Sequence, residues 1–531
     1  MKEMNQSIIP YTSNSNANDY ESEVSSADTY SNNSRLPKPA AMVAQFRDNY
    51  SGKLIWNTTS KSWFEYQDEL GIWVELNSES IQSLIQTELD ANPLTQFNYG
   101  SAYISDILNL LKNPLRVSEW NAKPNLLPLQ NGVLDLQTKE LLDHSPDYRF
   151  CWCLPYNYDP KATCEPIQEW LLEMMQGDEK IVQLLRAYMN AVIKGRSDLQ
   201  RFLECVGEGG TGKSTFANLV IALIGISNTH PTSLKTLETD RFENANLLGK
   251  RLVYIADSER YTRNVSKLKA LTGQDQLRYE KKYTQGGSSF RFDGMVLIVA
   301  NETIQFNDFT SGIQRRRITI PFNNRVRAEN RRNLIEVFST GISGEFAPYL
   351  SGLLNWVLEM SDDEVTELLK NTELSVPSLA MAAAETLIET NPMAAWLDEY
   401  VVIDSNAKTN VGSKKQPSST HLYPNYVSFC ESSGYKPVAT NLFSSRLVDL
   451  VCSQLKIDGV EKKHTRSGNC IVGLRLRTDG DTAPRPISDV MGNPILGDGS
   501  QDAETLIYKG FEGCDELDDH SSSSYDFAME F

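Results

Sequence analysis

One stretch of the sequence decides the fold of the region around it. Residues 207–214 read Gly207-Glu208-Gly209-Gly210-Thr211-Gly212-Lys213-Ser214. The apolar run Phe202 to Val206 before them predicts a short buried strand, and the run that starts at Thr215 has the apolar spacing of a helix. Strand, glycine-rich loop and helix are the context that the P-loop pattern G-x-x-x-x-G-K-[ST] requires. The alternative is an accidental glycine-rich turn, and the match at every specified position argues against it.

A P-loop predicts a nucleotide site. Its glycines let backbone N–H groups turn inward and surround triphosphate oxygens at the positive end of a helix. Lys213 can reach the β and γ phosphates, and the Ser214 hydroxyl can ligate Mg²⁺. We therefore expect ATP and Mg²⁺ to bind here. The expected contact residues are Gly207, Glu208, Gly209, Gly210, Thr211, Gly212, Lys213, Ser214 and Thr215.

A second buried strand is predicted at 250–256, and it ends in two acids, Asp257 and Glu259. An acid at the end of a neighbouring parallel strand orders the shell of the magnesium ion, and a second acid can polarise the attacking water. We expect Asp257 to share the metal with Ser214 and Glu259 to act as the base. The alternative is an ordinary acid at the end of a strand.

Two further features complete the set of candidate catalytic residues. A third buried strand, Met295 to Ala300, ends in Asn301, which can sense the γ-phosphate or position water; the alternative is an asparagine that caps the strand. Arg315, Arg316 and Arg317 then precede a β-like apolar segment. They form either a solvated patch or, beside an ATPase site, an arginine finger offered to a neighbouring subunit.

Residues 277–291 predict a hairpin with Lys281, Lys282 and Tyr283 near its tip. Attraction to phosphates needs cations, and stacking of bases needs aromatic rings, so the combination suits a strand of nucleic acid. The same combination also occurs on solvated hairpins with no ligand.

The length and composition of the chain limit the class of protein to which it can belong. A chain of 531 residues suggests two to four domains. It has no run of about 18 apolar residues that would span a membrane, and its polar beginning lacks the apolar core of a signal peptide. Eight cysteines without a framework fit a reducing cytoplasm. We expect a cytoplasmic protein with no membrane partner.

The net charge of −18 argues against a nucleic-acid partner until its distribution is considered. Residues 479–531 hold 13 Asp or Glu against only Arg485 and Lys509. The rest of the chain is only mildly acidic, so local basic clusters can still bind phosphates. Within this tail, residues 498–531 are either a solubilising segment, a docking peptide or a competitor of DNA.

The region before the P-loop predicts a polar disordered arm at 1–40 and then an α+β module at 41–165. Short strands are expected at 54–56, 63–66 and 71–74 and helices at 81–89 and 104–111. An Asn-Gly turn begins another strand at 131–136. After the P-loop helix, the polar segment 236–246 predicts a connecting loop.

The order of motifs between residues 207 and 322 resembles that of the superfamily 3 helicases of viruses, phages and plasmids, which are hexameric AAA+ ATPases. The stretches 131–136 and 154–158 are similar to the module before the helicase in poxvirus-type and phage/plasmid primase-helicases. Residues 353–357 resemble their following helical segment, and 422–447 their C-terminal winged helix.

This resemblance implies an α/β fold built on an AAA+ P-loop NTPase core, a parallel sheet with helices, at 166–345. The α+β module precedes it, a helical segment follows at 346–395, then a winged-helix-like DNA-binding domain at 396–478, and last the acidic disordered tail. The implied activity is that of an ATP-dependent DNA helicase of a phage, plasmid or integrated mobile element, in which a ring translocates on DNA and unwinds it.

The resemblance also assigns residues. Asn301 matches the sensor asparagine, and Lys282 and Tyr283 fall on the DNA-tracking hairpin. Arg316 best matches the arginine finger, with Arg315 as the competing register. The implied partners are single-stranded and forked DNA, further copies of the chain in a homo-oligomer, expected to be a hexamer, and a separate primase or single-strand-binding protein.

Two departures from the family pattern stand out. Ser258 separates the two acids, which weakens the assignment of Glu259 as base, and no primase catalytic domain is expected before residue 45. An assembly or regulatory switch that uses ATP without unwinding is the main alternative, and a nucleotide kinase is a third class. The cationic aromatic hairpin favours the helicase over the switch, and the winged-helix-like region argues against the kinase.

Overall fold

A computed structural model of the protein describes residues 36–118, 123, 125–256, 265–279, 288–304, 311–455, 457–465 and 468–489. Most of the predicted arm and acidic tail lie outside these ranges. The chain divides into two compact units: one comprises Met1–Tyr50 and Asn77–Leu115, and the other Ser51–Leu76 and Arg116–Phe531.

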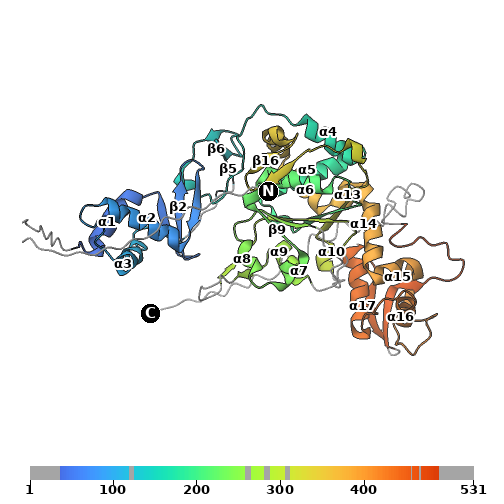
Figure 1. Ribbon diagram of the computed structural model, residues 1–531. Helices are drawn as coiled ribbons and strands as arrows, with labels where there is room; N and C mark the ends of the chain where they lie inside the picture. The colour runs from blue at the N-terminus through green and yellow to red at the C-terminus, as the bar shows by residue number, and fades with distance from the viewer. Residues whose placement is uncertain are drawn as a thin grey trace, which may run out of the picture. The chain divides into compact units, whose positions relative to one another are not determined.

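The first unit is helical in its described part. It contains α1 (Pro39–Tyr50), α2 (Ser78–Ala91) and α3 (Ser101–Leu111) (Figure 1). On α2, the side chains of Ile81, Ile85 and Leu89 recur every four residues and are buried, which is the stripe that a packed helix needs. The Asn77 side chain accepts a hydrogen bond from the Ser80 N–H at 2.7 Å and so caps α2. Both helices expected in this region are confirmed.

The second unit begins with two small sheets. The first has the strand order β3-β2-β1-β4 and the second has the order β5-β6-β7. Contacts between aromatic side chains stabilise the first sheet, in which the ring centroids of Tyr66 and Trp73 lie 5.3 Å apart. The three strands expected here and the strand after the Asn-Gly turn are confirmed. The bounds are β1 Leu54–Asn57, β2 Ser62–Gln67, β3 Ile72–Leu76, β4 Arg116–Val117, β5 Leu126–Leu129, β6 Gly132–Asp135 and β7 Leu141–Leu142.

A parallel sheet of five strands follows, in the order β14-β8-β13-β10-β9. Its strands are β8 (Phe202–Val206), β9 (Thr229–Thr232), β10 (Leu252–Ala256), β13 (Met295–Ala300) and β14 (Arg317–Pro321). Successive side chains point to opposite faces, so Leu203 and Leu297 join one core, whereas Phe202 and Val296 join another. Burial of both faces explains the continuous apolar runs of the sequence.

Helices cover both faces of this sheet. The core on one face includes side chains from α4 (Glu165–Met174), α5 (Glu179–Lys194) and α6 (Lys213–Ile224). The core on the other face includes side chains from α7 (Leu234–Thr239) and α9 (Ser266–Thr272). Figure 1 shows α5 and α6 on one side of the sheet and α7 and α9 on the other. The predicted mixed α/β class with a parallel sheet and helices is therefore confirmed.

The segment expected to be a connecting loop at 236–246 is helical, and that prediction is wrong. It contains most of α7 and all of α8 (Glu243–Asn246). Ser233 caps α7 by accepting a hydrogen bond from the Thr236 N–H at 3.1 Å. Leu234 and Leu237 lie three residues apart, on the same face of the helix, and both are buried. The cap and these two buried side chains stabilise a helix whose other residues are polar.

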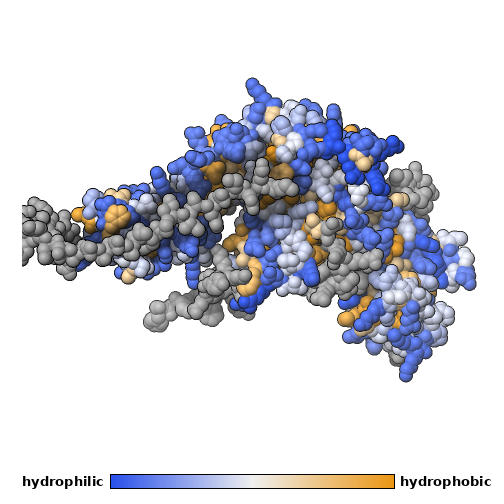
Figure 2. All heavy atoms as spheres, viewed as in Figure 1, coloured by the Kyte–Doolittle hydropathy of each residue, from blue (hydrophilic) through white to orange (hydrophobic). Residues whose placement is uncertain are grey.

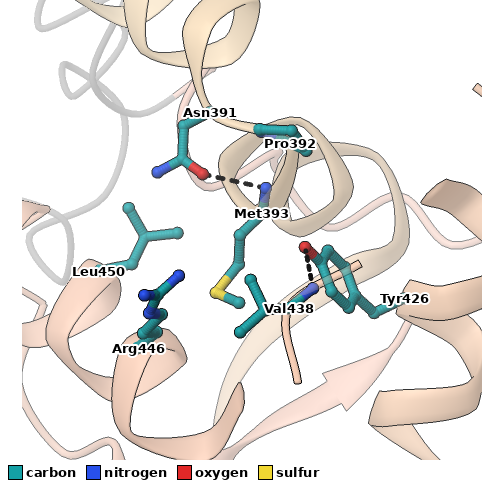
Figure 3. A pocket seen from close by; sticks show the side chains of 7 residues that line it. All are labelled: Asn391, Pro392, Met393, Tyr426, Val438, Arg446 and Leu450. Atoms are coloured by element: carbon teal, nitrogen blue, oxygen red, sulfur yellow. Dashed lines mark hydrogen bonds between the residues drawn. The ribbon is translucent and has the colours of Figure 1, made fainter. Parts of the chain in front are cut away.

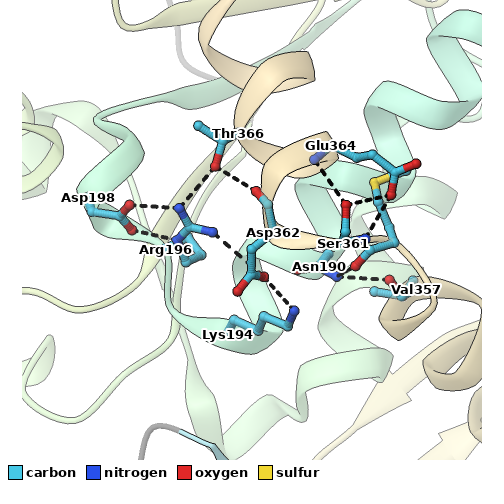
Figure 4. Close-up of polar contacts among 10 residues, drawn as sticks. Asn190, Lys194, Arg196, Asp198, Val357, Ser361, Asp362, Glu364 and Thr366 are labelled. Carbon is cyan, nitrogen blue, oxygen red and sulfur yellow. Dashed lines mark hydrogen bonds and ion pairs between the residues drawn. The ribbon is translucent and has the colours of Figure 1, made fainter. Parts of the chain in front are cut away.

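The helices after the sheet are bound to α5 by polar contacts (Figure 4). Lys194 Nζ lies 2.6 Å from Asp362 Oδ1, and the Asn190 side chain donates to the Val357 carbonyl at 2.9 Å. Ser361 and Glu364 form a capping box at the start of α12. The elements of this region of the chain are β15 Glu336–Phe338, β16 Gly341–Ser343, α11 Leu350–Leu358, α12 Asp362–Lys370, α13 Thr372–Ser375 and α14 Pro377–Thr390.

The C-terminal region places its helices against a three-stranded antiparallel sheet of order β17-β19-β18. The Trp396 ring lies 5.5 Å from Tyr426 and 5.7 Å from Phe443, and these three rings occupy the centre of its core. The winged-helix assignment itself stays a prediction. The bounds are α15 Pro392–Tyr400, β17 Val401–Asn410, α16 Leu422–Ser432, α17 Thr440–Val448, a π-helical turn Asp449–Gln454, β18 Glu461–Thr465 and β19 Gly468–Leu476.

Residues 479–489, which we expected to begin the disordered tail, are packed against this region. Ile487 is fully buried, and its N–H donates to Asp398 Oδ1 at 2.9 Å. The folded C-terminal region therefore includes residues 479–489, although the acidic composition of this segment predicted disorder.

Hydrophilic residues cover most of the visible face of the described chain (Figure 2). Within the part of the chain that the structure describes, no helix is long and apolar enough to cross a bilayer.

Candidate nucleotide-binding site

The glycine-rich loop joins the end of β8 to the start of α6. Gly207, Gly210 and Gly212 have φ values of +153°, +85° and +88°, in the region that favours glycine. The helix begins at Lys213, and no side chain caps it at Gly212. A helix start without a side-chain cap is a position that suits an anion. The predicted strand, loop and helix are all confirmed at these positions.

Close contacts explain two of these glycines. A β-carbon on Gly207 would lie 2.2 Å from the Phe322 carbonyl oxygen. A β-carbon on Gly212 would lie 2.7 Å from the Met174 sulfur. The contact at Gly207 is with backbone and leaves no room for a side chain. At Gly212 the Met174 side chain could move, and the φ of +88° is what requires glycine there.

Lys213 lies in the concave side of the loop. Its side chain is 6% exposed, and Nζ donates to the carbonyl oxygens of Gly207 at 2.6 Å and Glu208 at 2.7 Å. Thr211 Oγ1 donates to the same Glu208 carbonyl at 2.9 Å. The loop thus holds a buried ammonium group beside an uncapped helix end, which is a combination that suits a triphosphate.

The next two residues lie on the first turn of α6, with Ser214 exposed and Thr215 half-buried. The Ser214 hydroxyl stands where a P-loop supplies a magnesium ligand. Among the described residues, no group of three or more His, Cys, Asp or Glu could hold a metal ion. The residues fit Mg²⁺ that is carried mainly by phosphate oxygens and water, which is the usual arrangement for this ion.

The strand register brings Asn301 to the same edge of the sheet as the loop. Ala300, the last residue of β13, pairs with Val206, the last residue of β8, so Asn301 and Gly207 follow adjacent strand ends. Asn301 is exposed there. The strand β10 ends at Ala256, also at this edge.

Two sets of predicted site residues lie outside the described ranges. They are the acids Asp257 and Glu259 and the hairpin residues Lys281, Lys282 and Tyr283. The base of the hairpin is described: β11 (Leu277–Tyr279) and β12 (Ser288–Phe290) pair antiparallel, which confirms the predicted hairpin.

The arginine triplet lies at the opposite edge of the sheet. Arg317 pairs with Phe202, the first residue of β8. The glycine-rich loop follows Val206, the last residue of β8, so roughly 15 Å of strand separates Arg317 from the loop. Arg317 is buried, lies 3.7 Å from the Glu204 carboxylate and donates to the Ile304 carbonyl at 2.8 Å. Burial lowers the pKa of the Arg317 guanidinium, and Glu204 opposes that shift. Arg317 is thus held by contacts within its own chain.

The other two arginines differ in their exposure to solvent. Arg316 is half-buried, and its Nη1 donates to the Lys269 carbonyl of α9 at 3.1 Å. Burial and the neighbouring Arg315 lower the pKa of the Arg316 guanidinium. Arg315 is exposed. Neither side chain lies at the edge of the sheet that carries the glycine-rich loop of its own chain.

A cationic segment missed in the sequence lies against the glycine-rich loop. The Val326 N–H donates to the Gly210 carbonyl at 3.0 Å, and Arg325 lies 3.5 Å from the Glu208 carboxylate. The Arg331 guanidinium lies beside Gly210. The sequence feature that could have indicated this segment is the presence of four arginines within residues 325–332.

Two hollows in the described surface are lined by residues other than those of the glycine-rich loop. One, of about 10 Å³, is lined by Asn391, Pro392, Met393, Tyr426, Val438, Arg446 and Leu450 (Figure 3). It is only large enough for one water molecule. A larger one, of about 820 Å³, includes Leu172, Val182 and Trp356 in its lining.

Comparison with known proteins identifies the family of the chain. Residues 43–176 match the model of the D5 N terminal like family, and residues 389–472 match that of the poxvirus D5 protein-like family. The chain belongs to the D5-type primase-helicase family. Between these two D5-type domains, residues 205–317 match a family of unknown function, DUF5906, and this span runs from the glycine-rich loop to Arg317.

Two curated relatives of this D5-type chain come from Marchantia polymorpha. The uncharacterized mitochondrial protein ymf20 is 30% identical over 129 residues, which are 24% of this chain and 76% of ymf20. The uncharacterized mitochondrial protein ymf21 is 33% identical over 133 residues, 23% of this chain and 73% of ymf21.

Solved structures of the NrS-1 C-terminal region are also similar. One apo structure matches with a TM-score of 0.42 and 12% identity, covering 82% of this chain and 99% of that chain. A second matches with a TM-score of 0.43 and 12% identity, covering 83% and 100%. Membership of the D5-type family points to a role in the replication of phage or viral DNA.

Proposed function

We propose that this protein is an ATP-dependent DNA helicase of a phage, plasmid or integrated mobile element. In this proposal a ring of subunits hydrolyses ATP to translocate on DNA and unwind it. The observation that carries the proposal is the glycine-rich loop, with the buried Lys213 and an uncapped helix, at the carboxyl edge of a parallel sheet in a D5-type chain.

Residues of the loop edge would hold the substrate. Lys213 and the N–H groups of the first turn of α6 would face the phosphates of the bound nucleotide. Ser214 and Asp257 would hold Mg²⁺, which neutralises charge on the phosphate oxygens when it is bound. Glu259 would orient water, and Asn301 would sense the terminal phosphate from the neighbouring strand end.

An arginine finger would have to act on a neighbouring subunit. Arg315 and Arg316 lie at the edge of the sheet opposite the loop, so neither reaches the phosphates of its own chain without a rearrangement. Arg316 matches the family position but is tethered to the Lys269 carbonyl. Arg315 is exposed, and we propose it as the stronger candidate of the two.

The hairpin β11–β12 would contact single-stranded DNA through Lys281, Lys282 and Tyr283 at its tip. Its described strands supply a rigid base, since Leu277 and Tyr279 are buried. We propose a homo-oligomer, a hexamer in the family pattern, that acts on forked DNA with a separate primase or single-strand-binding protein.

The deciding experiment compares the wild type with Lys213→Ala. ATP hydrolysis is measured without DNA, with single-stranded DNA and with a labelled fork, and unwinding of the fork is measured in parallel. We expect DNA to stimulate hydrolysis and the fork to separate, and Lys213→Ala to lose both activities because the phosphates lose their cation. Hydrolysis that ignores DNA, without unwinding, would replace the helicase by an ATP-dependent assembly switch. Equal hydrolysis by both proteins would reject the nucleotide site.

A further inference from the structure

We propose that Arg331 is a phosphate-binding residue of the nucleotide site and acts from the same chain as Lys213. The inference rests on the proposed function, in that it requires the glycine-rich loop to bind a nucleotide. It adds to that site a second cation, which comes from a segment that follows the parallel sheet in sequence.

The first observation is the contact with the loop itself. A β-carbon built on Gly210 would lie 2.6 Å from Nη2 of Arg331 and 3.4 Å from Cζ. The guanidinium therefore occupies the space over the bare α-carbon of a glycine in the middle of the loop. Gly210 has a φ of +85°, so this glycine serves both the turn and the approach of the arginine.

The second observation is that the segment carrying Arg331 is anchored on both sides. On one side Phe322 is fully buried, and its ring lies 6.0 Å from that of Phe216 on α6. On the other side Ile335 is buried, and its carbonyl accepts a hydrogen bond from the Asn218 side chain of α6 at 3.4 Å. Both anchors lie on the helix that begins with Lys213, so the position of the segment over the loop is fixed.

The third observation is the pattern of charge pairing along the segment. Arg325 pairs with Glu208 at 3.5 Å, and Arg332 pairs with Glu345 at 2.9 Å. No carboxylate in the described part of the chain lies within ion-pair distance of Arg331. An exposed guanidinium next to a phosphate-binding loop is suited to an anionic ligand, because its planar fork can donate two parallel hydrogen bonds to phosphate oxygens.

A DNA backbone offers the same phosphate chemistry, but the geometry favours the nucleotide. Arg331 touches Gly210, within the loop that would surround the triphosphate, and the backbone of Val326 is bonded to the same glycine. The two ligands are separable by experiment.

The test measures the affinity of the purified full chain for ATP, ADP and adenosine by calorimetry, together with its affinity for a single-stranded oligonucleotide. Arg331→Ala is compared with Arg331→Lys, with Lys213→Ala, and with Arg332→Ala as the matched control, because Arg332 is the next residue and is paired with Glu345. Thermal unfolding of each variant checks the fold.

We expect Arg331→Ala to bind ATP roughly 10-fold more weakly, the loss expected for a hydrogen bond to a charged group, and to bind adenosine as the wild type does. Arg331→Lys should recover part of the loss, since it keeps the charge but not the fork. Arg332→Ala should match the wild type.

Unchanged ATP affinity in Arg331→Ala, with a clear loss in Lys213→Ala, would overturn the role of Arg331 and leave the proposed function in place. Weaker oligonucleotide binding with unchanged ATP binding would overturn it in favour of a DNA contact. Failure of the wild type to bind ATP would instead reject the proposed function itself.

Discussion

Gly209 and Gly210 are neighbours in the glycine-rich loop, but only Gly210 depends on the absence of a side chain. Gly210 has a φ of +85° and Arg331 against its α-carbon, whereas a β-carbon on Gly209 would meet no atom of the described chain within 4 Å. We expect Gly210→Ala to lower the free energy of unfolding by about 1 kcal/mol, the cost of a side chain in the left-handed region. It should also weaken ATP binding by displacing Arg331.

The matched control is Gly209→Ala, which adds the same methyl group one residue earlier. It should keep the wild-type free energy of unfolding in urea, because a β-carbon at this position meets no atom of the described chain within 4 Å. Equal effects of the two substitutions would show that the loop responds to added bulk in general rather than to the contact at Gly210.

Individual residues of the site were predictable where chemistry follows from a local pattern. The positions of Gly207, Gly212 and Lys213 follow from spacing alone, because strand, loop and helix are consecutive in sequence. The place of Arg331 depends on a segment more than 100 residues later that returns to the loop. The difference between Arg315 and Arg316 depends on which side chain α9 covers. Tertiary contacts decide both, and no local pattern records them.

Among the elements, the hairpin β11–β12 carries the clearest prediction for DNA. Lys282→Ala and Tyr283→Ala should keep ATP hydrolysis and lose unwinding, because the tip would transmit motion to the strand through charge and stacking. Removing the Lys282 charge should also flatten the salt dependence of single-strand binding by about one ion per engaged subunit. Fork unwinding and a salt titration of binding measure the two effects.

The control for the hairpin is Arg278→Ala. Arg278 is exposed on the described strand β11, so this substitution removes a charge from the same hairpin but away from its tip. It should unwind forks like the wild type. Wild-type unwinding in both tip variants would reject the assignment of the hairpin to DNA.

Acid sensitivity is expected in the C-terminal sheet. Arg475 on β19 forms ion pairs with Asp481 and, at 3.2 Å, with Asp404 on β17. Hydrogen bonding from Arg475 lowers the pKa of Asp481 from 3.8 to about 2. A carboxylate whose pKa falls on folding stabilises the fold above its unfolded pKa, and that contribution is lost as the pH falls from 3.8 toward 2.

The melting temperature of the wild type should therefore fall more steeply between pH 5 and about 2.5 than that of Asp481→Asn, which lacks the titrating group. Asp479→Asn, two residues earlier and exposed, should follow the wild type. Parallel curves for the wild type and Asp481→Asn would contradict the contribution of this ion pair to folding.

At the level of elements, long apolar patterns were predictable and short polar ones were not. The strands of the central sheet that are continuous apolar runs were identified, as were helices with a clear buried stripe. The strand β9 reads Thr229-His230-Pro231-Thr232 and carries no such pattern, although it pairs with β10 over its whole length. Its place at the edge of the sheet permits a proline, which a central strand would exclude.

For the whole molecule, the opposite placement of the loop and the arginines predicts complementation between subunits. Arg315→Ala should bind ATP normally yet hydrolyse it about 10³-fold more slowly, as expected for loss of an arginine finger. Lys213→Ala should not hydrolyse ATP at all. Mixing the two inactive proteins should restore part of the activity, because some interfaces then combine an intact loop with an intact arginine.

The same mixture made with Arg316→Ala identifies which arginine acts. Because Arg316 donates to the Lys269 carbonyl, its removal should also lower the melting temperature, whereas removal of the exposed Arg315 should not. A mixture that recovers no hydrolysis with either arginine variant would contradict a site shared between subunits.

The register of β14 along β8 also restricts the symmetry of any active assembly. The two strands run parallel, so one end of the sheet carries the glycine-rich loop and the other end carries Arg315. If these two ends must meet, the surfaces in contact are different on the two partners, and an isologous dimer with a two-fold axis cannot join them. Such heterologous contacts either close into a cycle or grow as a helical filament. In a filament the last site always lacks its arginine, and only closure makes every site equivalent.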